Sequence, residues 1–256
     1  MDPATLIGVA LALIALLITM VMEGSSPMAI FLIPPLILVF GGTFGAAIAG
    51  STMNDVKKIG AWLKMGFLPA AVPPAFDKIQ TLVSLAEKAR KEGLLALEAE
   101  VKKIDDPFLK RGLQMSIDGT DPEDLRAVLE AEIAAKKSED KVAAKFFTGM
   151  GGYAPTVGII GTVVGLIHVL ENLDQPELLG PLIAGAFVAT LWGVLSANFF
   201  WLPMAAKITR TSDLQAAQME LLVEGISEIQ AGTSPRTVRQ KLTSLVPPSE
   251  QQREAA

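Results

Sequence analysis

All 22 lysine and arginine residues of this 256-residue chain lie in two stretches, 51–145 and 206–256. A helix needs about 20 largely apolar residues to cross the hydrocarbon core of a membrane. Most of the remaining chain consists of four runs that contain no Asp, Glu, Lys or Arg, at 3–22, 24–54, 146–170 and 178–206. Each run is therefore predicted to cross the membrane once.

The charge distribution also predicts the orientation of the chain. Basic residues near the ends of membrane-spanning helices remain on the cytoplasmic side. The stretches 51–145 and 206–256 are therefore expected in the cytoplasm, while the short acidic connections at Glu23 and 171–177 face outward. Four spans place both termini in the cytoplasm.

The fold class predicted from this pattern is an all-α integral membrane protein with a helical cytoplasmic domain. Residues 1–50 would carry the first two spans, 51–145 the cytoplasmic domain, 146–206 the other two spans, and 207–256 a cytoplasmic helix and tail. The four spans are expected at about 4–22, 28–50, 147–170 and 179–203.

Local signals refine this prediction. Pro34-Pro35 should bend the second span. Ile79, Leu82, Leu85 and Ala86 share one side of an amphipathic helical segment over 77–103, which Gly93 should interrupt. Asp121-Pro122 is typical of a helix start. That helix should continue into the third span, and a helix over 208–230 should lead out of the fourth. Both spans are thus expected to extend into the cytoplasm.

Two matched faces of small residues mark the third and fourth spans. Pro155, Gly158, Thr162 and Gly165 follow one another at helical spacing. Ala186, Thr190, Gly193 and Ala197 do the same in the next span. Such faces can simply pack helices together, with each threonine bonded to its own helix. Because two adjacent spans carry the same pattern, the sequence favours a wall that faces something functional.

The spans contain no side chain that could carry an ion by itself. Ion pathways through membranes usually include an ionisable group, and none of the four runs holds Asp, Glu, Lys or Arg. If the chain moves ions, a second chain must supply a carboxylate. His168 is the one titratable side chain nearby, and it is expected to be a hydrogen-bonded residue at the outer interface.

Other classes of function find little support. A net charge of −5 without a dominant basic stripe argues against a nucleic-acid partner. The chain has no cysteine, a single histidine and no phosphate-binding loop of the Gly-x-x-x-x-Gly-Lys-Ser/Thr type. We therefore expect a non-enzymatic energy transducer with no resident cofactor or metal.

The chain resembles one known family over almost its whole length, most specifically in four segments. The chain is similar to the MotA/PomA group of flagellar motor stator A subunits. The Gly161-Thr162-x-x-Gly165-Leu166 piece alone also resembles the ExbB and TolQ energisers, which remain the alternative. The segments that carry the resemblance are AEKARKEGLLALE (86–98), YAPTVGIIGTVVGLI (153–167), GPLIAGAFVATLWGVLSANFFWLP (180–203) and EGISEIQAGTSPRTVRQKL (224–242).

The resemblance implies a homopentamer of A subunits around two B subunits in the bacterial inner membrane, in contact with lipid. Each B subunit would carry one span with an essential aspartate and a peptidoglycan-binding domain. H⁺, or alternatively Na⁺, would pass between that aspartate and the third and fourth spans. Thr162, Thr190 and Pro155 would then belong to the ion pathway, and Na⁺ could bind transiently near the threonines.

The resemblance also implies roles for residues outside the pathway. Pro155 and Pro203 match two prolines that couple ion binding to movement of the cytoplasmic helices. Arg90 and Glu98 match a charged pair that contacts the rotor protein FliG, and on one ideal helix they would lie on neighbouring faces. Packing against the B-subunit helix would involve Gly158, Gly165, Ala186, Gly193 and Ala197.

Overall fold

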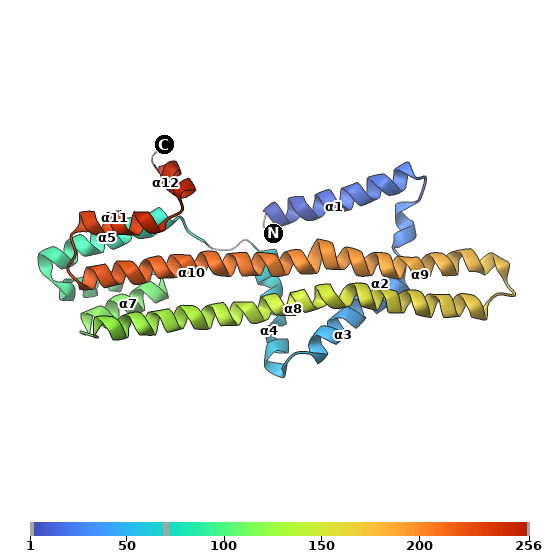
Figure 1. Ribbon diagram of the computed structural model, residues 1–256, viewed down its shortest axis with the longest axis horizontal. Coiled ribbons are helices and arrows are strands. Elements are labelled where there is room, and N and C mark those ends of the chain that lie inside the picture. Colours follow the sequence, from blue (N-terminus) through green and yellow to red (C-terminus); the bar gives the residue numbers. More distant parts are fainter. Residues whose placement is uncertain (1–2, 69–71, 255–256) are drawn as a thin grey trace. The chain divides into compact units, whose positions relative to one another are not determined.

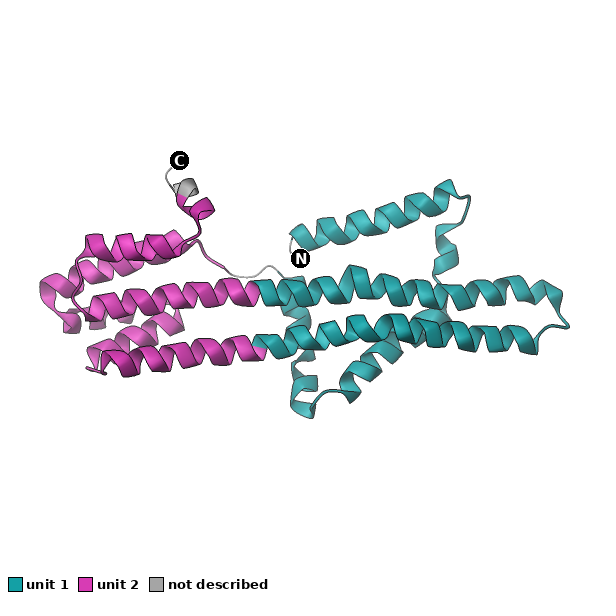
Figure 2. Cartoon of the chain, in the orientation of Figure 1, with its two compact units in different colours: residues 1–70, 140–210 teal, residues 71–139, 211–256 magenta. Residues whose placement is uncertain are grey.

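The structure is a computed structural model that describes residues 3–68 and 72–254, and all regular elements in these ranges are helical. The chain forms two compact units (Figure 2). Unit 1 comprises residues 1–70 and 140–210, and unit 2 comprises residues 71–139 and 211–256. Two long helical segments, over residues 122–171 and 176–230, each include residues of both units. The sequence predicted this continuation of the third and fourth spans.

The first of these long segments is α8, a single helix of 50 residues over Pro122–Glu171 (Figure 1). Asp121 lies directly before it, and its carboxylate accepts a hydrogen bond from the backbone N–H of Glu123 at 2.9 Å. Proline is tolerated in the first turn because the N–H groups there have no acceptor within the helix. The predicted start at Asp121-Pro122 is confirmed.

The second long segment begins with α9 over Pro176–Ser196. It passes through the π-helical turn η4 over Ala197–Trp201 and continues as α10 over Leu202–Gln230. A π-helical turn widens the helix locally. The turn ends two residues before Pro203, whose ring would otherwise press against the carbonyl four residues earlier.

The remaining elements of unit 1 come from the N-terminal part of the chain. The helix α1 covers Pro3–Met22, and α4 covers Met53–Phe67. Although α4 belongs to the predicted cytoplasmic stretch, it packs within unit 1, where the rings of Trp62 and Phe146 lie 5.5 Å apart. Between α1 and α4 the order is η1 (Pro27–Ile30), α2 (Ile33–Leu36), the π-helical turn η2 (Ile37–Gly41) and α3 (Gly42–Ala49).

The predicted second span differs in detail from the structure. Its apolar helical segment covers Ile33–Ala49, which is 17 residues, or about 25 Å against a hydrocarbon core of about 30 Å. Pro34 and Pro35 lie in the first turn, where proline begins a helix and does not bend it. The segments long and apolar enough to cross a membrane in the described residues are Pro3–Met22, Pro122–Glu171 and Pro176–Gln230.

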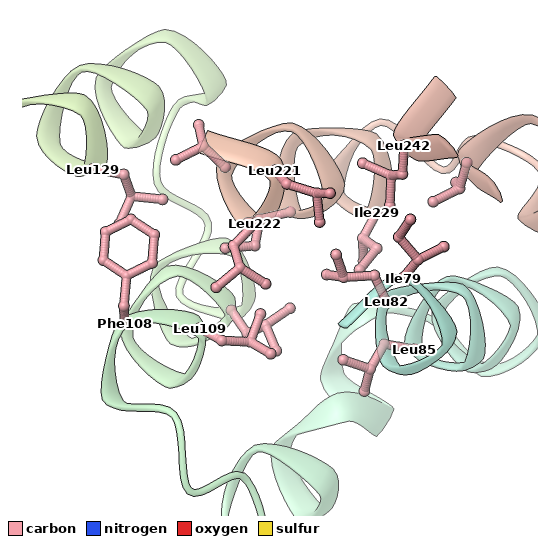
Figure 3. Close-up of a cluster of buried hydrophobic side chains, with 14 of the residues drawn as sticks. Ile79, Leu82, Leu85, Phe108, Leu109, Leu129, Leu221, Leu222, Ile229 and Leu242 are labelled. Carbon is pink, nitrogen blue, oxygen red and sulfur yellow. The ribbon is translucent and has the colours of Figure 1, made fainter. Parts of the chain in front are cut away.

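Unit 2 is a small helical domain built around buried aliphatic side chains (Figure 3). Ile79, Leu82, Leu85 and Ala86 are buried in its core, as the sequence pattern predicts. Its helices are α5 (Ala75–Glu92), η3 (Leu94–Leu97), α6 (Glu98–Val101), α7 (Pro107–Ile117), the first part of α8, the last part of α10, α11 (Pro235–Leu245) and α12 (Pro248–Glu254).

Candidate functional site

The two threonines singled out by the sequence meet between α8 and α9. The hydroxyl groups of Thr162 and Thr190 are hydrogen-bonded to each other. Thr162 Oγ1 also lies 3.2 Å from the carbonyl oxygen of Gly158 and 3.1 Å from that of Ala186. Thr190 Oγ1 lies 3.4 Å from the same Gly158 oxygen. The pair therefore links the two helices and also bonds back to the backbone.

The chemistry of this pair is that of a neutral oxygen site. Each hydroxyl has one proton to donate and two lone pairs that accept. Both protons are used within the α8–α9 contact, because carbonyl and hydroxyl acceptors surround them. Lone pairs of the hydroxyl oxygens remain, so the site can accept a hydrogen bond from a protonated acid or offer oxygen to a cation. It cannot itself release a proton at neutral pH.

Close approach of the backbones makes this contact possible. A Cβ atom added to Gly193 would lie 2.6 Å from the carbonyl oxygen of Ala154 and 3.0 Å from the Cα of Gly158. One added to Gly165 would lie 2.6 Å from the Cβ of Ala186. Only small residues allow helices to approach this closely.

The small residues on these two faces were also predicted to pack against a helix of the B subunit. That packing stays a prediction, because it concerns a second chain. In the structure these residues pack where α8 meets α9 of the same chain, or in the core beside that contact. Most of their surface is therefore covered within the chain. The residues concerned are Gly158, Ala186, Gly193 and Ala197, which are buried, and Gly165, which is half-buried.

The two edges of the α8–α9 contact differ. On the edge at Gly161, the side chain of Leu38 closes the contact, since an added Cβ would lie 3.0 Å from its Cδ2. Thr162 and Thr190 remain half-buried. Beside them, Ile159 and Phe187 are 55% and 63% exposed. A partner helix could reach the hydroxyl pair across these exposed apolar side chains. Nothing in the sequence predicts that Leu38 packs here, apart from the missing side chain at Gly161 that leaves room for it.

The two predicted coupling prolines lie in unit 1. Pro155 is half-buried inside α8 and offers no N–H to the carbonyl of Gly151. A Cβ on Gly151 would lie 2.4 Å from Cδ2 of Leu202, the residue before Pro203. The backbone of α8 just before Pro155 thus packs against the start of α10. The coupling role of the prolines stays a prediction.

Arg90 and Glu98 belong to different helices of unit 2. Arg90 lies in the last turn of α5 and Glu98 begins α6. Gly93 separates them with a φ of +85°, a conformation that favours glycine. The spacing on one ideal helix therefore does not apply, because the helix ends at Gly93, as the sequence predicted. Both side chains are exposed, and Glu98 pairs with Lys102 at 3.2 Å. Their contact with a rotor stays a prediction.

His168 lies where the sequence analysis expected a hydrogen-bonded residue. Its ring nitrogen Nδ1 is 3.4 Å from the Glu171 carboxylate, and the side chain is 61% exposed. Within residues 3–68 and 72–254, no three His, Asp or Glu side chains gather closely enough to hold a metal ion. The threonine pair is thus a neutral oxygen site within apolar segments of the chain.

Comparisons with known proteins agree with these observations. The model of the MotA/TolQ/ExbB proton channel family matches residues 100–221. Motility protein A of Bacillus subtilis (strain 168) is 35% identical over 247 residues, which cover 96% of this chain and 92% of that protein. The C. jejuni MotAB structure matches 97% of both chains with a TM-score of 0.92 and 28% identity. The flagellar MotAB stator complex of Bacillus subtilis matches 99% of this chain and 100% of that chain, with a TM-score of 0.91 and 34% identity.

Proposed function

The chain belongs to the motility protein A group of the MotA/TolQ/ExbB proton channel family, and we propose that it turns ion flow into torque on the flagellar rotor. It is a membrane-embedded subunit of a flagellar stator and assembles with a B subunit, as the matching MotAB complexes do. The predicted stator function is confirmed in preference to an energiser of the ExbB/TolQ kind. The proposal adds how this chain contributes to ion flow.

The hydroxyl pair of Thr162 and Thr190 is the observation that carries the proposal. It is a neutral oxygen site inside segments that contain no Asp, Glu, Lys or Arg. The B subunit would supply the aspartate, whose protonated form donates to a hydroxyl lone pair. For Na⁺, the same lone pairs and the aspartate would share the cation. The exposed apolar side chains of Ile159 and Phe187 would line the approach of the B helix.

The ion and the voltage set the available energy. One elementary charge that moves through 100 mV releases about 2.3 kcal/mol. Pro155 and Pro203 would transmit the change in aspartate charge, because each marks a place where a helix lacks a backbone hydrogen bond. Arg90 and Glu98 would contact the rotor, since exposed charges bind quickly and separate easily when screened by salt.

The proposed assembly follows from the same family. Five copies of this chain would surround two B subunits in the inner membrane, with both termini in the cytoplasm. Residues 28–50 would form the second span, helped by the turn at Pro27–Ile30 and by local thinning of the bilayer. The ring would place the threonine edges of successive copies toward the B helices.

The decisive experiment removes one hydroxyl at a time. Thr190→Val and Thr190→Ser would be expressed with the genomic B partner in a motile cell that lacks its own stator. We expect the valine variant to lose most of its swimming speed and the serine variant to retain it, because only serine keeps the hydroxyl. Thr156→Val is the matched control, since among the described residues Thr156 Oγ1 donates only to the carbonyl of Tyr153, at 2.8 Å. Normal swimming of Thr190→Val would contradict the proposal.

The same cells identify the ion. Swimming would be tracked with and without external sodium. Motility that persists without sodium establishes H⁺ as the ion, and motility that requires sodium makes the threonines part of a Na⁺ site. Membrane assembly would be measured for each variant, so that a loss of motility is assigned to ion flow and not to missing protein.

A further inference from the structure

The helix α4 lies where two of the charge-free runs of unit 1 end. The ring of Trp62 lies 5.5 Å from that of Phe146, which is the first residue of the run 146–170. A Cβ atom added to Gly66 would lie 2.1 Å from Cγ of Met204, two residues before the end of the run 178–206. One side of α4 therefore packs against both long helical segments at the level where their apolar parts end.

The direction of α4 differs from that of the membrane-spanning segments. Within unit 1, Figure 1 shows α8 and α9 running side by side and α4 running across them. Helices that cross a membrane are tilted by only about 20° on average from the membrane normal. A helix that runs across them where their apolar parts end thus lies along the membrane surface. The sequence agrees, because three lysines in the 15 residues of α4 are too many for the hydrocarbon core.

The inner side of α4 is apolar. Trp62 and Gly66 are buried, and Ile59, Leu63 and Phe67 are half-buried against the same core of unit 1. These contacts fix which side of the helix faces away from the protein.

The outer side of α4 carries two lysines. Lys57, Gly60, Ala61 and Lys64 follow one another at helical spacing, and all four are exposed. A Cβ atom added to Gly60 would meet nothing within 4 Å, so the space in front of this face is open. Within residues 3–68 and 72–254, neither lysine forms an ion pair. This face therefore presents two positive charges that the described part of the chain does not neutralise.

The rest of α4 fits the boundary between headgroups and acyl chains. Its one acidic residue, Asp55, is held at the start of the helix, where its carboxylate accepts hydrogen bonds from the N–H and the hydroxyl of Thr52. At the two ends of the outer side, Met53 is 70% exposed and Leu68, directly after the helix, is 48% exposed. Lysines beside exposed apolar side chains are typical of helices that lie in the membrane interface.

We propose that α4 lies in the headgroup layer at the cytoplasmic surface of the membrane and that Lys57 and Lys64 bind anionic phospholipid headgroups there. The phosphate groups of these lipids are the anions present at this level. Because α4 packs on Met204, directly after Pro203, the headgroup contact holds α4 at a fixed level beside a proposed coupling proline. The inference rests on the membrane position of the proposed stator and does not depend on which ion the stator uses.

A second copy of the chain is a poorer partner for this face. The residues that flank the charge-free runs at the same level are Lys145 and Lys207. A neighbouring copy would therefore bring further positive charge toward Lys57 and Lys64, whereas anionic headgroups bring the opposite charge.

The test measures which lipid lies beside α4 in the complete stator complex. Because the chain has no cysteine, Ala61→Cys with a cysteine-free B subunit accepts a single fluorescent dye on the outer side of α4. The complex would be placed in nanodiscs with equal amounts of phosphatidylglycerol and phosphatidylcholine, one of which carries a nitroxide quencher near its headgroup. We expect stronger quenching by phosphatidylglycerol. A dye on Ser244→Cys in unit 2 is the control that neither lipid should quench.

Variants of the two lysines test the charge. Lys57→Gln combined with Lys64→Gln should lower the preference for phosphatidylglycerol about 30-fold, because each basic residue near an anionic membrane contributes about 1 kcal/mol. Lys110→Gln combined with Arg236→Gln removes the same charge from exposed positions of unit 2 and should leave the preference unchanged. High salt should weaken the preference of the wild type as well.

The outcomes separate lipid from protein in front of α4. Equal quenching by the two lipids, or an unchanged preference in the double lysine variant, would overturn the proposal. Absence of quenching by either lipid at position 61 would place protein against this face and overturn it as well. Size-exclusion chromatography would establish assembly, and Gly60→Cys offers a second labelling position on the same face. None of these measurements requires ion flow, so their failure is distinct from a failure of the Thr190→Val test.

Discussion

Replacing Gly193 by alanine tests whether the close approach of α8 and α9 holds the threonine pair together. The added Cβ atom would lie 2.6 Å from the carbonyl oxygen of Ala154 and 3.0 Å from the Cα of Gly158. Both neighbours are backbone atoms, which cannot rotate away as the end of a side chain can. Ordinary contacts between such atoms lie near 3.5 Å. The helices would therefore have to separate by about 0.5–0.9 Å.

The expected cost follows from this displacement. Overpacking of a well-packed interior typically costs about 1–3 kcal/mol. Alanine also favours a helix over glycine by about 1 kcal/mol, which partly offsets the cost. Gly185→Ala is the matched control in the same helix, because its Cβ would lie 3.8 Å from Leu32 Cδ1, an ordinary contact. Both variants gain the same helix propensity from alanine, so their free energies of unfolding should differ by the overpacking cost alone, about 1–3 kcal/mol.

The assay is equilibrium unfolding of the purified stator complex in mixed detergent micelles, with increasing fractions of dodecyl sulfate. Tryptophan fluorescence is the signal, since Trp192 and Trp201 are buried in unit 1. Gly193→Ala should unfold at a lower fraction and should also lose motility, because separated helices stretch the bond between the threonine hydroxyls. If Gly193→Ala is as stable as Gly185→Ala, the argument from close backbone packing is wrong.

Two further predictions concern unit 2. Reversing the charge at Arg90 or Glu98 should reduce torque in tethered-cell rotation without changing ring assembly, and unchanged torque under load in the double reversal would contradict a rotor contact. Asp106→Ala should lower the stability of unit 2 by about 1–2 kcal/mol, since Asp106 accepts hydrogen bonds from two backbone N–H groups at the start of α7 and pairs with Lys78 at 2.7 Å, partly exposed to solvent. Partial burial tends to raise the pKa of Asp106, but the hydrogen bond from Lys78 and those from the backbone outweigh it and hold the pKa below its usual value. The stabilisation is thus present above about pH 4, the ordinary aspartate range, and is lost as the pH falls through the lower folded-state pKa. Thermal melts of wild type and Asp106→Ala should converge at the acid end, and a constant difference down to pH 2 would refute this account.

The long helices were predictable because their signals are local and physical. Runs without charged residues identify Pro3–Met22 and the apolar parts of α8 and α9. Asp121 and Gly93 act through their own backbone neighbours, so the start of α8 and the end of α5 could be predicted. The core positions of α5 follow from helical periodicity. These features depend on a few adjacent residues and not on the tertiary arrangement.

The second span and the small-residue faces depend on more than adjacent residues. Pro34-Pro35 can either bend a helix or begin one, and only the position of the preceding turn decides between them. A face of glycine and alanine fits a helix of the same chain as well as one of a partner. The sequence predicts both helices of the contact. It does not tell whether each small-residue face meets the other helix of this chain or a helix of a partner. Packing of these faces against a B-subunit helix therefore stays a prediction.

The close contact between α8 and α9 restricts where a carboxylate of a second chain could approach the threonine pair. Because Gly158, Gly193 and Ala186 pack directly between α8 and α9, a partner helix cannot insert between these helices. Leu38 closes the edge at Gly161. What remains accessible is the edge at Thr162 and Thr190, where two hydroxyl oxygens are half-buried among exposed apolar side chains. An aspartate brought to that edge would leave water as it meets the hydroxyls, and its charged form is disfavoured there more strongly than its protonated form. On the proposed function, binding of the ion and docking of the B helix would therefore be linked, which is the coupling that a stator needs to convert ion flow into movement.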